Sequence, residues 1–165
     1  MLVGLAGLPA SGKTAVAKKL EKRGFKNLSR DYFVSLMFDP VNFSSREQKD
    51  IAFKAMLLVS KYYLKQEKKV VLDCPSFSRG WAVKLAQATA KKASVKFKLI
   101  YLECPDEVAV KRIKFAKKHI ARDRTPKLYF TVKKRFQPIK IKYKKIGTNR
   151  PIKKTIKEII KYLKK

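Results

Sequence analysis

Apolar residues along this chain fall into short continuous runs separated by longer stretches with helical spacing. The runs at 2–6, 70–72 and 97–102 predict strands buried on both faces, and 27–29 predicts a further short strand. Apolar residues recur every three or four positions over 12–20, 45–66, 79–92 and 152–163, which predicts helices. Asp106 is expected to cap another helix, and the Ile-Lys-Ile-Lys-Tyr alternation at 139–143 predicts a half-exposed edge strand.

The order of these elements determines the expected fold class. Strands that alternate with helices form a parallel sheet with helices on both faces. We therefore expect an α/β fold with a central parallel sheet of about five strands, in one domain over residues 1–165. In such a sheet, ligands bind at the carboxyl ends of the strands.

Composition excludes several classes of protein. Hydrophobic residues make up 45% of the 165 residues, which is enough for a core and excludes wholesale disorder. Apolar runs fall short of the roughly 18–20 residues of a membrane span, and the start lacks the basic region of a signal peptide. Two cysteines are too few for a disulfide framework. A cytoplasmic protein without structural metal is expected.

Net charge is the most unusual property of the composition. The chain has 42 Lys and Arg against 12 Asp and Glu, a formal charge of +30. Residues 1–82 hold 15 basic and 7 acidic residues, and residues 83–165 hold 27 and 5. A lysine-rich proteome is one explanation, but thermophilic enrichment adds Glu alongside Lys. Unpaired lysines attract polyanions, so we expect a nucleic acid partner, RNA or tRNA, at the basic C-terminal half.

The segment Gly7-Leu8-Pro9-Ala10-Ser11-Gly12-Lys13-Thr14 fits the phosphate-loop (P-loop) pattern G-x-x-x-x-G-K-[ST] between a predicted strand and a predicted helix. Its backbone is expected to curl around a phosphate at the helix N-terminus, with Gly7, Pro9, Ala10, Ser11 and Gly12 in the cradle. Lys13 is expected to reach the β- and γ-phosphates and Thr14 to ligate Mg²⁺. ATP and Mg²⁺ are therefore the predicted cofactors.

A P-loop alone does not identify the reaction. A chain of 165 residues leaves little room for a motor module, and the sequence downstream holds no N-K-x-D-like guanine-reading motif. Both observations favour a small kinase.

Two carboxylates follow predicted strands. Asp31 is expected to act as the base that takes the acceptor proton, and the alternative is that it caps the next helix. Asp73 is expected to support Mg²⁺, and the alternative is an ordinary acid at a strand end. Arg30, which precedes Asp31, and Arg79, six residues after Asp73, are expected to bind the acceptor.

A cluster of basic residues follows the fourth predicted strand, in the region where small kinases carry a lid, at about 114–128. Positive charge there stabilises the transferring phosphate and excludes water. Arg112 is expected to be catalytic, Arg122 to bind the nucleotide and Arg124 to bind the acceptor. The alternative is a solvated basic helix. The cluster comprises Arg112, Lys117, Lys118, Arg122 and Arg124.

The P-loop, Ser-Arg-Asp-Tyr-Phe at 29–33, Val-Val-Leu-Asp-Cys-Pro-Ser-Phe-Ser-Arg at 70–79 and Tyr-Leu-Glu-Cys-Pro at 101–105 together resemble P-loop kinases of the polynucleotide 5′-kinase and seryl-tRNA kinase type. The resemblance runs to about residue 138. It implies that Asp31 is the general base, that Asp73 is the acid of the third strand and that Arg112 is the first lid arginine.

The chain departs from this pattern at two positions. The phage-like enzymes have a second acid after the base and an arginine three residues beyond the base, where this chain has Tyr32 and Val34. That arginine helps to hold the acceptor phosphate, which argues against a standard 5′-hydroxyl polynucleotide. Seryl-tRNA kinases also carry an extra tRNA-binding domain, which the basic tail 133–165 would replace.

The expected function is an ATP- and Mg²⁺-dependent kinase acting on a hydroxyl, with RNA or tRNA as the leading acceptor. One alternative is a kinase of small metabolites or nucleotides. Another is an RNA- or ribosome-associated ATPase switch that forms no phosphorylated acceptor.

Overall fold

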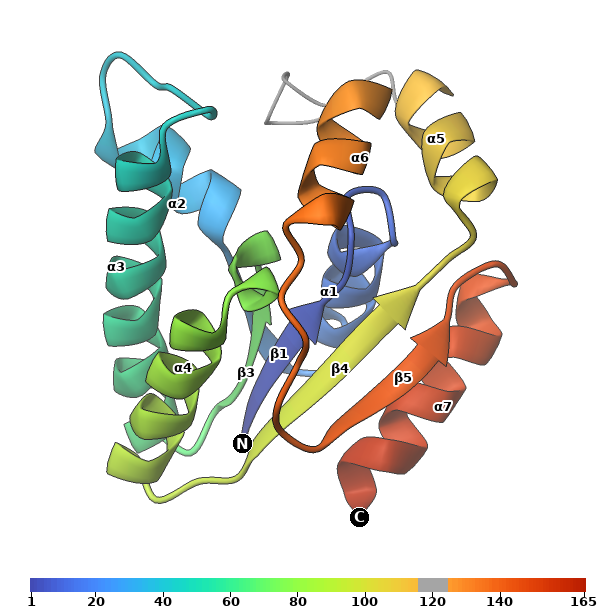
Figure 1. Cartoon of the computed structure of the whole chain (residues 1–165). Coiled ribbons are helices and arrows are strands. Elements are labelled where there is room, and N and C mark those ends of the chain that lie inside the picture. Colours follow the sequence, from blue (N-terminus) through green and yellow to red (C-terminus); the bar gives the residue numbers. More distant parts are fainter. Residues whose placement is uncertain (116–124) are drawn as a thin grey trace.

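The computed structural model describes residues 1–115 and 125–165, and for Ser76 the backbone alone. Five parallel strands form one sheet in the order β2-β3-β1-β4-β5, with helices on both faces (Figure 1). The α/β fold class is therefore confirmed. The elements are β1 (Leu2–Ala6), α1 (Lys13–Glu21), β2 (Phe25–Ser29), α2 (Arg30–Met37), α3 (Arg46–Lys65), β3 (Lys69–Asp73), the 3-10 helix η1 (Pro75–Ser78), α4 (Gly80–Lys92), β4 (Phe97–Glu103), α5 (Asp106–Phe115), α6 (Pro126–Lys134), β5 (Tyr143–Gly147) and α7 (Ile152–Lys164).

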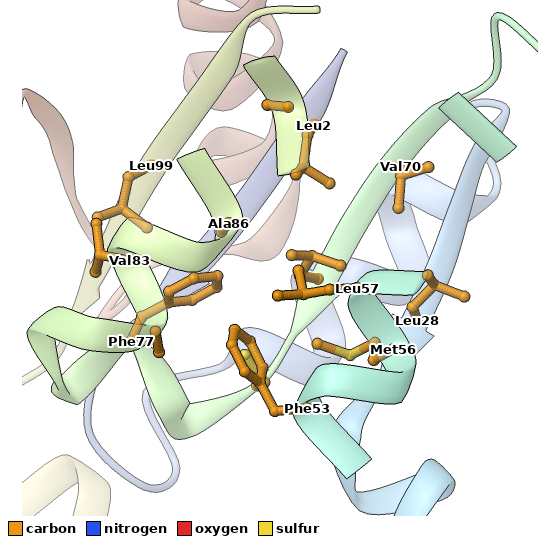
Figure 2. Packing of buried hydrophobic residues seen from close by; sticks show 14 of the residues in the cluster. Leu2, Leu28, Phe53, Met56, Leu57, Val70, Phe77, Val83, Ala86 and Leu99 are labelled. Carbon is orange, nitrogen blue, oxygen red and sulfur yellow. The ribbon is translucent and has the colours of Figure 1, made fainter. Parts of the chain in front are cut away.

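Two apolar layers hold the sheet between its helices. On one face, α3 and α4 pack against the sheet through Phe53, Met56 and Ala86, and Phe77 of η1 fills the space between them (Figure 2). On the other face, α1 and α7 contribute Val16, Leu20, Ile156 and Ile159. The central strand β1 is buried along its whole length, which explains its uninterrupted apolar sequence.

Capping residues define where two helices begin. The Ser45 hydroxyl accepts a 3.2 Å hydrogen bond from the Gln48 N–H at the start of α3. The Thr125 hydroxyl does the same for the Leu128 N–H at 3.1 Å, and Pro126 occupies the first turn of α6. The helix α3 was predicted from the sequence, whereas α6 was not.

The predicted strand at 139–143 is wrong. Pairing with β4 begins only at Tyr143, which lies opposite Leu99, and β5 continues to Gly147. Ile139 and Ile141 instead pack against the apolar cluster on the α4 side of the sheet, while Lys140 and Lys142 are exposed. An extended segment with one face against a core alternates in the same way as an edge strand, and so the pattern was misread.

Within the described residues, no helix is both long and apolar enough to cross a bilayer.

Candidate functional site

The P-loop connects β1 to α1 at the carboxyl edge of the sheet, where Figure 1 shows it beneath the lower end of α6. Its backbone takes positive φ at Gly7 (141°), Ala10 (58°) and Gly12 (92°). A Cβ atom on Gly7 would lie 2.4 Å from the Leu102 carbonyl oxygen and 2.6 Å from the Ser11 hydroxyl. The curled conformation therefore requires glycine at position 7.

Lys13 and Thr14 form the first turn of α1, behind a turn made by Pro9 and Ala10. The Lys13 side chain is buried and folds back along the loop. Its ammonium donates to the Gly7 carbonyl at 2.8 Å, to the Leu8 carbonyl at 2.7 Å and to the Ser11 hydroxyl at 3.3 Å. The loop therefore holds a positive charge at its centre, beside the N-terminus of α1, which favours binding of an anion.

Strand register brings the two predicted carboxylates to this edge. Asp73 pairs with Leu5 of β1 on one side and with Ser29 of β2 on the other. Neighbouring strands lie about 4.8 Å apart, so the start of the P-loop, Asp73 and the Arg30-Asp31 pair are within roughly two strand spacings of one another. Asp73 and Asp31 are both largely buried, as is expected of groups that work inside a site.

Asp31 lies in the first turn of α2, which begins at Arg30, so it is not the helix cap. Its Oδ1 atom accepts hydrogen bonds from Arg30 Nε at 3.1 Å and Nη2 at 2.6 Å. The contact is buried on both sides. Arg30, predicted to bind the acceptor, thus contacts the predicted base and fixes the direction of its carboxylate.

Arg79 lies just before α4 and forms an ion pair with Asp50 of α3. Its Nη1 atom donates to Asp50 Oδ2 at 3.1 Å, and its Nη2 atom donates to Oδ1. The guanidinium also lies 4.8 Å from the centroid of the Trp81 ring. This side chain therefore ties α3 to the start of α4, near the end of β3.

Arg112 of α5 contacts the P-loop directly. Its Nη1 atom donates to the Ala10 carbonyl at 3.2 Å and to the Thr148 hydroxyl at 3.4 Å, and its Nη2 atom donates to the Thr148 carbonyl at 2.7 Å. Thr148 in turn donates its N–H to the Glu103 carbonyl at 2.7 Å and its hydroxyl to the same oxygen at 3.1 Å. One guanidinium thus joins the P-loop to the ends of β4 and β5.

Thr148 was not among the site residues predicted from the sequence. The residue is buried, and its side chain reaches to within 4.0 Å of the position a Cβ would take on Gly12. A signal was present in Gly147-Thr148-Asn149, because these residues end and follow the final strand at the carboxyl edge of the sheet. The edge strand was placed four residues too early, which put this segment outside the predicted site.

Cys104 lies beside the same link. Burial raises the pKa of its thiol, and this effect outweighs the nearby Arg112 guanidinium and a hydrogen bond with Thr148, both of which lower it. The thiol is therefore held in its neutral, unreactive form.

The helices α5 and α6 flank the predicted lid. Asp106 accepts a 2.8 Å hydrogen bond from the buried Tyr129 hydroxyl and also binds Lys133. These hydrogen bonds, that of Lys133 first, lower the pKa of Asp106. Arg122 and Arg124, together with Lys117 and Lys118, lie outside the described residues, so their predicted roles stay predictions.

Solved structures with the same architecture include several kinases. A candidate kinase from Chloroflexus aurantiacus J-10-fl superposes with a TM-score of 0.76 at 21% identity, covering 99% of this chain and 96% of that one. The APS kinase CysC of Mycobacterium tuberculosis, in complex with AMPPNP and APS, superposes with a TM-score of 0.75 at 19% identity, covering 99% of this chain and 97% of that one. A gluconokinase from Sinorhizobium meliloti 1021 superposes with a TM-score of 0.69 at 14% identity, covering 98% of this chain and 90% of that one.

The comparison with curated proteins gives no match. The resemblance to polynucleotide and seryl-tRNA kinases therefore stays a prediction, while the similarity to small-molecule kinases extends over the whole chain at the level of the fold. Residues 2–134, which contain the P-loop, Asp31, Asp73 and Arg112, match the sequence profile of the family AAA_33, described as an AAA domain. On this match the chain belongs to the AAA_33 family, and it has a kinase-like P-loop fold.

Proposed function

We propose that the protein is an ATP- and Mg²⁺-dependent kinase that transfers the γ-phosphate to a hydroxyl of a small metabolite. The observation that carries this proposal is the register that places Asp73 between the strand leading to the P-loop and the strand leading to Asp31. A phosphate-binding loop, a metal-supporting acid and a base at one sheet edge are the parts that phosphoryl transfer requires.

The residues present fit the nucleotide and the metal. Glycine at position 7 permits the curled loop, because a Cβ there would overlap the Leu102 carbonyl, and Lys13 supplies a cation that can exchange backbone carbonyls for phosphate oxygens. The Thr14 hydroxyl and the Asp73 carboxylate are oxygen donors of the kind that Mg²⁺ prefers. When bound, Mg²⁺ neutralises charge on the phosphate oxygens.

Asp31 would accept the proton of the attacking hydroxyl as the new oxygen–phosphorus bond forms and ADP leaves. Arg30 keeps its carboxylate pointing in one direction through two hydrogen bonds. Arg112 adds positive charge at Ala10 of the P-loop, where it would stabilise the phosphates. The preference for a small acceptor is supported by the structural neighbours, among them an APS kinase and a gluconokinase.

An RNA hydroxyl is the second candidate acceptor, and the net charge of +30 favours it. The two candidates differ in their response to salt. The affinity of the enzyme for an RNA acceptor should fall steeply as ionic strength rises, whereas its affinity for a small metabolite should change little.

The test uses γ-labelled ATP with three separate acceptor pools: small metabolites with nucleosides, total tRNA, and 5′-hydroxyl oligonucleotides. Label in the small-molecule pool is expected, and label in RNA that falls with salt would favour the second candidate. Phosphate release without any labelled acceptor would refute a kinase. Asp31→Asn should lower kcat by about 10²- to 10⁴-fold, whereas Glu47→Gln, a matched loss of an exposed acid on α3, should leave it unchanged.

A further inference from the structure

The helix α7 has an unusual division of side chains. Its apolar residues Ile156, Ile159 and Leu163 are buried against the sheet. Every residue of α7 that is exposed is a lysine. We call this set the α7 lysine face; it comprises Lys153, Lys154, Lys157, Lys161 and Lys164.

The one acid of α7 does not neutralise this face. Glu158 forms ion pairs with Arg150 and with Lys144, the latter at 3.1 Å. Its carboxylate is thereby committed to residues from the β5–α7 loop and from β5. Residues 133–165 hold 14 Lys and Arg and this single Glu, so acids elsewhere in the tail cannot compensate.

This arrangement is unfavourable for the helix itself. Lys153, Lys157 and Lys161 are spaced four residues apart on one side, and like charges at this spacing destabilise a helix by a few tenths of a kcal/mol each. Two lysines also occupy the first turn, where the helix dipole disfavours cations. The single Glu of α7, Glu158, follows Lys154 by four residues, which is the less favourable order for such a pair, and its carboxylate binds Lys144 and Arg150.

Protection of a sheet edge does not explain the face. Lysines on an edge strand discourage strand pairing between molecules, and the lysines that flank and occupy β5 can serve that role. The helix α7, however, covers one face of the sheet beside α1 and has no unpaired strand to protect. Exposed lysines of α1, Lys18 and Lys19, extend the basic surface on that same side.

We propose that the α7 lysine face binds the phosphate backbone of nucleic acid. A helix of 13 residues is about 20 Å long, and its face offers roughly one cation per turn along that length. Protein partners usually engage aromatic or apolar anchors, and the exposed residues of α7 include none. A membrane-surface helix would need apolar residues to insert, and those of α7 are used by the core.

This binding does not depend on phosphotransfer. The C-terminal end of α7 lies at the edge of the sheet opposite the P-loop, where Lys98 near the start of β4 donates to the carbonyls of Tyr162 at 3.0 Å and Leu163 at 3.2 Å. Lys13→Met should therefore keep nucleic acid binding while losing phosphotransfer. Failure of the kinase assay with intact RNA binding would count against the proposed function alone.

The test is anisotropy of a fluorescent 20-nucleotide single-stranded RNA, without ATP, in 100 mM KCl. The variant Lys157→Glu/Lys161→Glu is compared with Lys54→Glu/Lys91→Glu, which removes two exposed lysines from α3 and α4 on the opposite face. Both variants lower the formal charge by the same amount. The α7 variant should raise the Kd at least tenfold and the control less than threefold. Thermal midpoints and phosphotransfer of the small acceptor report whether each variant is folded.

Salt dependence provides the second readout. Replacing two phosphate-contacting lysines by glutamine in Lys157→Gln/Lys161→Gln should reduce the slope of log K against log salt by about 1.4, as expected for a single strand. Equal weakening by both Glu variants would overturn the proposal, because it would show attraction by net charge alone. A wild-type Kd above about 10⁻⁴ M would also overturn it. Tighter binding to phosphatidylserine vesicles than to RNA, abolished in the α7 variant, would overturn it in favour of a membrane.

Discussion

The Nη2 atom of Arg112 donates a 2.7 Å hydrogen bond to the carbonyl oxygen of Thr148, which joins α5 to the loop before α7. Because Nη1 of the same side chain reaches Ala10, the guanidinium fixes the P-loop against two segments that are distant in sequence. The planar fork of arginine suits such a double contact, and the single ammonium of lysine does not.

Arg112→Lys should therefore weaken the positioning of the P-loop without removing the charge. Hydrogen bonds that involve a charged group contribute about 1.5–3 kcal/mol, so we expect kcat/KM for ATP to fall by about 10- to 100-fold. Steady-state kinetics measures the effect, with Arg135→Lys, an exposed arginine at the end of α6, as control. Unchanged kinetics in Arg112→Lys would show that the link is dispensable.

Gly7→Ala and Gly24→Ala separate steric overlap from backbone strain. Both glycines have positive φ, 141° and 85°, but a Cβ on Gly7 would overlap the Leu102 carbonyl, whereas one on Gly24 would have nothing within 4 Å. Gly24→Ala should cost about 1–2 kcal/mol in the free energy of unfolding. Gly7→Ala should cost at least about 1 kcal/mol more. Urea denaturation of both variants gives the comparison, and equal losses would contradict the overlap.

Tyr129→Phe should change stability in a pH-dependent way. Burial, and then the hydrogen bond to Asp106, raise the pKa of Tyr129 above its usual value of about 10. Above that pH the unfolded chain loses the phenolic proton while the folded chain keeps it, so this group's contribution to stability is lost as the pH rises. We expect Tyr129→Phe to lower the free energy of unfolding by about 1 kcal/mol at pH 8.

The same variant should lose less stability than the wild type between pH 8 and pH 11, because it lacks the perturbed phenol. Denaturation midpoints across this range provide the measurement. Tyr62→Phe is the control, since the Tyr62 side chain is exposed and its ring packs edge-on against that of its neighbour Tyr63. A parallel loss in Tyr129→Phe and wild type would contradict the role of this hydroxyl.

Asp73→Asn tests the proposed support of the metal. Removing the carboxylate charge should raise the Mg²⁺ concentration needed for half-maximal phosphotransfer, because a neutral amide binds Mg²⁺ more weakly than a carboxylate does. Asp31→Asn should lower kcat without moving that concentration, since Asp31 is assigned to the proton. A Mg²⁺ titration of both variants distinguishes the roles, and a shift in Asp31→Asn alone would reverse them.

Local sequence was sufficient for most elements and for the centre of the site. The buried strand β1 and the P-loop after it were predicted residue by residue, because a continuous apolar run and a glycine pattern are local properties. The helix α3 was located within one residue at each end. Its apolar residues are not equally buried, since Ile51 is 40% exposed whereas Phe53 is buried. Which side of a helix faces inward depends on what packs against it.

Tertiary structure decided the contacts between distant segments. The sequence determined that Lys13 opens a helix, that Asp73 ends a strand and that Asp31 follows one, all at the carboxyl edge, because residue type and element order are local properties of the chain. It could not determine that Arg112 contacts Thr148, 36 residues away, or that Arg30 and Arg79 pair with Asp31 and Asp50. It also misplaced the final strand, because Ile-Lys-Ile-Lys-Tyr at 139–143 alternates apolar and polar residues, whereas the strand Tyr143–Gly147, with the sequence Tyr-Lys-Lys-Ile-Gly, does not. Only the neighbours available in the folded chain determine whether the backbone forms a sheet or a side chain forms an ion pair.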